Sequence, residues 1–253
     1  MKTLKLFGIA LLTVLFGVSF SACSSSSSDD DNVDNGSGSS PATTNKFLIK
    51  QTKTNKDGEV QLEWTYSYDS NNRLSKISAV SHVGNMSADS YSYSYGNNSI
   101  EVNGITYNLS NGLVISSSDG VSFAYDNDGY LTSATKDGNT ITYTWSGGNL
   151  MNISYKRSSG SEELESISFE YTNLTYPQNF PYSPENIEFK EFPSLLKYWG
   201  KTPKNLPQKY VVKQKGNIEG TESYDYTMQN GYPSIIKRTN TRGHVSINTL
   251  EWK

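Results

Sequence analysis

The sequence is short of several residue types, and each shortage excludes a class of protein. One cysteine among 253 residues excludes an internal disulfide framework and a zinc site built from several thiolates. Two histidines argue against a transition-metal site, and no metal or other cofactor is expected. The 22 Lys+Arg against 25 Asp+Glu give a formal charge of −3, which argues against nucleic acid as a partner. A mean hydropathy of −0.59 excludes a polytopic helical membrane protein.

The first residues have the pattern of a bacterial sorting signal. Lys2 and Lys5 precede an apolar run over residues 6–20, and small residues then lead to Cys23. This pattern resembles a lipobox, so we expect residues 1–22 to be removed and Cys23 to become the lipidated N-terminus. Several acyl chains on Cys23 would hold the chain stably on a membrane. The alternative is an ordinary signal peptide cleaved after Ala22, which leaves a free thiol.

Residues 23–45 predict a disordered tether that places the protein at the bacterial cell envelope. Five serines at 24–28 are followed by Asp29, Asp30, Asp31 and Asp34, with no apolar periodicity. We interpret the acidic cluster as a solvated linker rather than a calcium site. Acidic residues soon after a lipidated cysteine resemble the surface-export signal of Bacteroidetes-type lipoproteins. We therefore expect an outer-membrane lipoprotein, on either the periplasmic or the surface face.

From about residue 46 to residue 253 the chain predicts a single all-β domain. Turn-forming pairs such as Asn103-Gly104, Asn111-Gly112, Asp137-Gly138 and Asn230-Gly231 recur, and they favour tight hairpins. Between them aromatic and polar residues alternate, as in Trp64-Thr65-Tyr66-Ser67-Tyr68. Period two with one apolar face predicts half-buried antiparallel strands.

The strands also repeat as units of about one hairpin each. An aromatic-x-aromatic strand end is followed by a polar turn and then by two apolar residues three positions apart. The apolar pairs are Leu74 and Ile77, Leu150 and Ile153, and Tyr232 and Ile235. A β-bulge at the start of each return strand would put both members of a pair on one face and bend the sheet. Repeated bends predict an up-and-down meander curled into a barrel-like, water-soluble sheet.

Residues 172–207 interrupt this pattern. Six prolines exclude a central strand from this region. Within it, the segment from Phe192 to Trp199 predicts a short helix, with Pro193 near its first turn and Gly200 near its end. The apolar residues of this insertion would allow it to plug or cap the sheet, and the alternative is a loop packed on the outside.

Two of the repeated units resemble a known repeat. Tyr66-x-Tyr68-Asp69 with Arg73-Leu74, and Phe123-x-Tyr125-Asp126 with Gly129-x-Leu131, resemble the YD repeats of Rhs-type shell proteins. The whole chain, with its lipobox, Ser/Asp tether, Tyr-rich hairpins and Pro-rich interruption, resembles Bacteroidetes lipoproteins that contain a domain of unknown function, family 4595. This resemblance covers roughly residues 46–253 and implies a porin-like fold. It implies no activity and no functional residues.

No catalytic motif stands out, and an enzyme is not expected. The sequence has no Gly-x-Ser-x-Gly elbow, phosphate-binding glycine loop or His-Glu-x-x-His motif. We interpret His82 and His244 as surface histidines, and the run Asp126-Asn127-Asp128-Gly129 as a hairpin turn rather than a calcium loop. Carboxylates available to a hydrolase are Glu162, Glu163, Glu165, Glu185, Glu188, Glu191, Glu219 and Glu222.

The aromatic stripe is the one feature to which the sequence allows a binding role. The candidate residues for stacking on a sugar or apolar ligand are Tyr66, Tyr68, Tyr93, Tyr95, Tyr143 and Trp145. The competing interpretation, which we favour, is that they fill the interior of a barrel. Three functions remain: a non-catalytic module that binds a glycan or other envelope component, a structural partner in an outer-membrane assembly, and a carboxylate-dependent hydrolase.

Overall fold

The computed structural model describes residues 46–84, 89–159, 163–177, 179–180 and 193–253. The signal peptide, Cys23 and the tether lie outside the described residues, as does part of the proline-rich insertion. No helix in these described ranges is long and apolar enough to cross a membrane.

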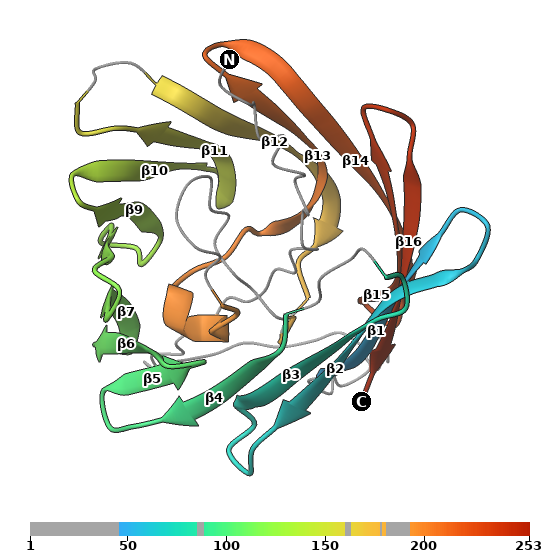
Figure 1. The fold of residues 1–253 in the computed structure, drawn as a ribbon, viewed down its shortest axis with the longest axis horizontal. Helices are drawn as coiled ribbons and strands as arrows, with labels where there is room; N and C mark the ends of the chain where they lie inside the picture. The colour runs from blue at the N-terminus through green and yellow to red at the C-terminus, as the bar shows by residue number, and fades with distance from the viewer. Residues whose placement is uncertain (1–45, 85–88, 160–162, 178, 181–192) are drawn as a thin grey trace, which may run out of the picture.

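The described chain forms a closed antiparallel barrel of sixteen strands, shown in Figure 1. Its first half contains β1 (Leu48–Asn55), β2 (Val60–Tyr68), β3 (Leu74–Ser81), β4 (Tyr91–Tyr95), β5 (Ser99–Val102), β6 (Ile105–Ser110), β7 (Leu113–Ser117) and β8 (Ser122–Tyr125). Its second half contains β9 (Leu131–Lys136), β10 (Asn139–Ser146), β11 (Asn149–Lys156), β12 (Glu163–Thr175), β13 (Asn205–Gln214), β14 (Asn217–Gln229), β15 (Tyr232–Asn240) and β16 (Val245–Trp252). Each strand pairs with its sequence neighbours, and β1 pairs with β16 to close the barrel. The all-β, up-and-down prediction is confirmed.

The aromatic face of the even-numbered strands points into the barrel. On β2, Trp64 and Tyr66 are buried, whereas Thr65 and Ser67 between them are exposed. The same alternation places Phe123 of β8 inside and its neighbours Ser122 and Ala124 outside. Tyrosine and tryptophan therefore supply the interior, and the outer wall consists mainly of short polar side chains.

The hairpin turns form where the sequence predicts them. The central residues of the Asn-Gly and Asp-Gly pairs at 103–104, 111–112, 137–138 and 230–231 all have positive φ. Such angles match the twist of a two-residue hairpin, and glycine adopts them at no steric cost. Asp126 fills a related role, since its carboxylate accepts hydrogen bonds from the backbone N–H groups of Asp128 and Tyr130. The turn interpretation of this acidic run is confirmed.

The predicted β-bulges are present at the start of the return strands. On β3, Ser75 is the extra residue, because Tyr68 pairs with Leu74 while Ser67 pairs with Lys76. Leu74 and Ile77 are consequently both buried, and Leu150 and Ile153 of β11 behave alike. The third predicted pair is wrong by one residue. The bulge in β15 lies at Ser234, so Pro233 and Ile236 face inward and Ile235 is 37% exposed.

Seven bulges at the start of odd-numbered strands are each accompanied by a hydrogen bond from an aromatic side chain. Bulges occur at the start of β1, β3, β7, β9, β11, β13 and β15. Each of these strands has a backbone carbonyl near its bulge that accepts a side-chain hydrogen bond from the following even-numbered strand. The donors are Tyr68 to Leu48, Tyr95 to Leu74, Tyr125 to Val114, Trp145 to Leu131, Tyr171 to Leu150, Tyr226 to Pro207 and Trp252 to Pro233.

The exception among these hairpins supports the rule. β5 pairs with β4 without a register shift, and the corresponding position of β6 is Leu109, whose side chain has no donor. We call these seven tyrosine and tryptophan residues, taken together as a set, the aromatic ring. Because a bulge interrupts the strand ladder locally, a side-chain donor satisfies a carbonyl that the ladder leaves short of a partner. The aromatic ring thus stabilises one end of the barrel.

The proline-rich insertion between β12 and β13 enters the barrel at this same end. Its described part forms one 3-10 turn, η1 (Leu196–Trp199), which Figure 1 shows inside the ring of strands. Trp199 is fully buried, with ring centroids 5.0 Å from Phe123 of β8 and 5.9 Å from Tyr107 of β6. The short helix is therefore present as a single 3-10 turn, and it plugs the barrel rather than packing outside.

Buried tyrosines make the barrel sensitive to alkaline pH. Burial raises the pKa of Tyr66, Tyr68, Tyr125 and Tyr226 well above the ordinary value of 10.0. The stabilisation from each is complete below pH 10 and is lost as the pH rises towards the folded-state pKa, because the unfolded chain releases its proton first. We expect the absorbance at 295 nm to rise for exposed tyrosines near pH 10, and for buried ones only together with loss of circular dichroism. A smooth titration of all 18 tyrosines near pH 10, with unchanged dichroism, would contradict this burial.

Candidate functional site

The six candidate stacking residues are divided between two locations. Tyr66, Tyr93 and Tyr143 lie on the inner wall and are only 7%, 9% and 3% exposed. Tyr68, Tyr95 and Trp145 are half-buried members of the aromatic ring, each donating to a backbone carbonyl.

The ring faces of the half-buried members are also in contact with other side chains. The guanidinium of Arg73 lies 4.1 Å from the centre of the Tyr95 ring, and Tyr130 packs on Trp145 at 4.7 Å. The six residues do not form one open aromatic surface in the described structure. Ligand stacking on them stays a prediction.

A second set of inner residues is polar. Tyr66 of β2, Gln51 and Lys53 of β1, Asn248 of β16, Arg238 of β15 and Glu222 of β14 form what we call the inner polar row. These strands are consecutive neighbours around the wall, so side chains distant in sequence become adjacent. The row crosses the seam where β1 and β16 close the barrel.

The amides of the row are hydrogen-bonded in sequence around the wall. Tyr66 Oη donates to Gln51 Oε1 at 3.1 Å, and Gln51 Nε2 donates to Asn248 Oδ1 at 3.0 Å. Gln51 and Asn248 are almost completely buried. Buried amides are costly unless paired, so this chain of bonds fixes their orientation.

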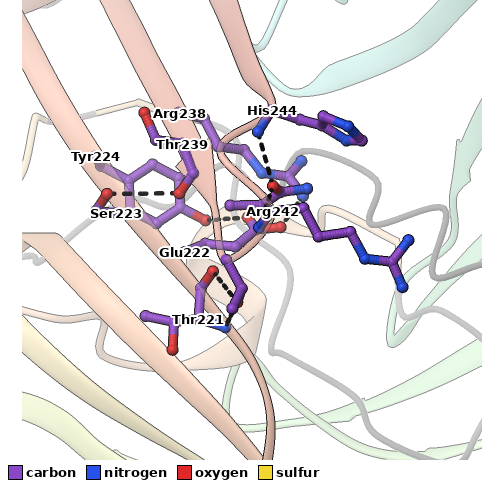
Figure 2. A network of polar contacts seen from close by, with 10 residues as sticks. Thr221, Glu222, Ser223, Tyr224, Arg238, Thr239, Arg242 and His244 are labelled. Carbon is purple, nitrogen blue, oxygen red and sulfur yellow. Dashed lines mark hydrogen bonds and ion pairs between the residues drawn. The ribbon is translucent and has the colours of Figure 1, made fainter.

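Figure 2 shows the ion pair of the row and its surroundings. Arg238 forms an ion pair with Glu222, and both side chains are largely buried, 12% and 11% exposed. Tyr224 Oη also donates to the Glu222 carboxylate, at 3.4 Å. The adjacent turn presents Arg242 and His244, which are exposed. Buried charges persist in proteins when they are paired and hydrogen-bonded, as Glu222 is here.

Lys53 is the second cation of the row. It pairs in register with Leu62 and Asn248, both buried, so its side chain lies on the inner face. Burial lowers the pKa of Lys53, and the nearby Arg238 lowers it further, while Glu222 acts in the opposite direction. Among the described residues, Lys53 and Arg238 therefore share one nearby carboxylate, that of Glu222.

The remaining candidates do not assemble into a site. His82 is exposed and lies 2.9 Å from Glu63 Oε2 on the outer wall, and His244 is exposed at the β15–β16 turn. Glu222 is held by Arg238, Glu219 is exposed, Glu165 is half-buried and Glu163 begins β12. Glu162, Glu185, Glu188 and Glu191 lie outside the described residues. Within the described ranges no group of His, Cys, Asp and Glu could hold a metal ion.

Sequence reasoning missed the inner polar row. Lys53 and Arg238 lie in the parts of their strands, residues 50–55 and 237–240, where both faces carry polar residues, so period two gives no signal there. A detectable hint was Gln51, which lies three residues after Leu48 at the offset of the other bulged pairs. That offset would have placed Gln51, and hence Lys53, inside.

Comparisons with known proteins give similarity at low sequence identity. No protein-family model matches the chain, and no curated protein matches it. A porin-like protein from Bacteroides uniformis is 16% identical, with 83% of this chain and 99% of that chain covered, at a TM-score of 0.43. A porin-like protein from Bacteroides vulgatus is 14% identical, with the same coverage, 83% and 99%, at a TM-score of 0.41. The chain is thus similar to Bacteroides porin-like proteins.

Proposed function

We propose that this protein is a lipid-anchored, non-catalytic component of the bacterial envelope that binds a glycan or another envelope molecule within its barrel. The observation that carries the proposal is the inner polar row. An interior that served only to hold the fold together would be filled with apolar and aromatic side chains, as it is around Trp199. Instead, paired amides and charged groups line the wall from β14 to β2.

The character of the outer wall supports a barrel surrounded by water. A membrane-spanning barrel presents an apolar band to lipid, with strands of about 9–11 residues. Here outward positions include Thr65, Ser67, Thr142 and Thr144, all exposed, and β4 to β8 have only four to six residues each. In our proposal the acylated Cys23, not the barrel, holds the protein on the outer membrane.

The anchoring part of the proposal is tested at Cys23. In the native host, Cys23→Ala is expected to abolish incorporation of radiolabelled palmitate and to move the protein from the membrane fraction to the soluble fraction. Ser24→Ala, at the next position, is the control and should leave both unchanged. Retention of label and of membrane association in Cys23→Ala would contradict lipidation at this residue.

The binding part is tested with the full acylated chain in detergent micelles on an array of bacterial and host glycans. Retention of a defined glycan class is the expected result. If no glycan is retained and the chain instead copurifies in fixed ratio with an outer-membrane protein, the proposal is wrong and a structural role replaces it. The large apolar side chains exposed among the described residues come from several strands, for example Val80 of β3, Ile115 of β7 and Ile218 of β14.

A further inference from the structure

Lys53 has the position of a binding group rather than of a structural one. Its side chain lies on the inner face, and its ammonium makes no hydrogen bond or ion pair with any described residue. Its two charged neighbours are Arg238, which repels it, and Glu222, which is already engaged by Arg238 and Tyr224. A partly dehydrated cation without a direct partner destabilises the fold, so a structural role does not explain it.

A second unsatisfied group lies on the same wall. The hydroxyl of Tyr93 on β4 is buried and has no hydrogen-bond partner among the described residues. The hydroxyl of Tyr93 lies near enough to Tyr66, the first member of the inner polar row, for the two phenols to interact electrostatically. Buried hydroxyls in native proteins nearly always have a partner, so an unpartnered one calls for a ligand or water that accepts or donates there.

The two groups define the chemistry of a ligand. An ammonium offers three donors and a positive charge, and a phenol offers one donor and an acceptor. Tyr66 of β2 lies between the two strands that carry them, and it is hydrogen-bonded to Gln51 of β1, which in turn contacts Asn248. The exposed Arg242 and His244 add basic groups at the adjacent turn, in a chain whose net charge is −3. The complementary molecule is anionic and rich in hydroxyl groups.

We propose that the inner polar row is a binding site for a carboxylated saccharide, whose carboxylate is held by Lys53 beside Arg238 and whose hydroxyl groups meet Tyr93. This inference rests on the proposed function and specifies its ligand class. The carboxylate supplies the negative charge that Lys53 lacks. Displacement of water from Lys53 and the carboxylate strengthens the contact between them, because charge-assisted hydrogen bonds are stronger than neutral ones.

The test is calorimetric titration of the full chain with matched saccharide pairs. The probes are oligosaccharides of galacturonate, glucuronate and sialate, each beside the same oligosaccharide with its carboxyl groups reduced to alcohols. The wild-type chain is expected to bind at least one carboxylated probe about tenfold more tightly than its reduced partner. Lys53→Met should remove this preference, and Tyr93→Phe should weaken binding of both partners.

The control is Lys237→Met, which removes the same charge from the outer face of β15, next in sequence to Arg238. It should leave binding unchanged. Lys53→Met is expected to fold and to melt no lower than wild type, because it removes an unpartnered charge from the interior.

The outcomes separate this inference from the proposed function. Equal affinity for carboxylated and reduced probes, or full binding by Lys53→Met, overturns the carboxylate site while a glycan-binding function stands. Failure of every glycan, neutral ones included, to bind overturns both.

Discussion

Replacing Gly200 with alanine is expected to lower the free energy of unfolding by about 3 kcal/mol or more, among the larger effects of a single substitution. A Cβ at this position would lie 2.3 Å from the carbonyl oxygen of Gly129, and the φ of +81° with ψ of −150° is a region occupied almost only by glycine. The next residue, Lys201, donates its N–H to that same Gly129 carbonyl at 2.9 Å, so the plug cannot move without losing this bond. For a domain of this size the melting temperature should fall by roughly 6–12 °C.

The variant Gly231→Ala separates the two effects expected in Gly200→Ala, which are the close approach of the Cβ to the Gly129 carbonyl and the backbone strain of a positive φ. Gly231 also has a φ of +80°, but nothing lies within 4 Å of the added Cβ. Its expected cost is about 1 kcal/mol, from the positive φ alone. Hydrogen exchange of residues 193–204, followed by mass spectrometry, should increase in Gly200→Ala and not in Gly231→Ala. If Gly200→Ala and Gly231→Ala lose equal stability and hydrogen exchange of residues 193–204 is unchanged, the packing of Gly200 against the Gly129 carbonyl does not hold the insertion in the barrel.

Removing hydroxyls from the aromatic ring is the second change with a large expected effect. The variant with Tyr68→Phe, Tyr171→Phe and Tyr226→Phe loses three donors to the carbonyls of Leu48, Leu150 and Pro207. Each loss leaves a carbonyl without its side-chain partner and should cost about 1–2 kcal/mol. The Tyr68 site lies on strands remote from the other two, so its effect should add to theirs. Tyr171 pairs in register with Pro207, the acceptor of Tyr226, so these two losses are coupled, and the total is expected to be about 3–6 kcal/mol. Urea unfolding followed by circular dichroism measures the sum.

Tyr93→Phe is the matched control for the aromatic ring. It also removes a buried tyrosine hydroxyl, but one without a partner among the described residues, so stability should change by less than about 0.5 kcal/mol. A loss in Tyr93→Phe as large as in the single ring variants would mean that the carbonyl bonds are not the reason for the ring's effect.

The local features of the fold could be predicted because they depend on few neighbouring residues. Asn-Gly and Asp-Gly pairs determined hairpin positions through their φ preference, and the three-residue offset of Leu74 and Ile77 identified a bulge. The same logic failed at Ile235, because the bulge of β15 lies at Ser234, one residue later than the offset predicts. The turn at Lys215-Gly216 was also missed, because lysine is not a residue that favours positive φ, although its φ is +47°.

The candidate site could not be predicted, because it depends on long-range closure of the barrel. Gln51 and Asn248 are 197 residues apart, and only the pairing of β1 with β16 brings them together. No local pattern indicates that a chain of sixteen strands closes at this register. The aromatic residues are recognisable in the sequence. Which of them lie on the inner wall, which belong to the aromatic ring and which contact Trp199 depends on where the insertion enters the barrel.

The most direct test of the account is a crystal structure of the full chain with the carboxylated oligosaccharide that binds most tightly. The account predicts that the saccharide lies inside the barrel, with a carboxylate oxygen about 3 Å from Lys53 Nζ and a hydroxyl in contact with Tyr93 Oη. A saccharide stacked on Tyr143 and Trp145, or bound to the outer wall, with Lys53 and Tyr93 untouched, would contradict it.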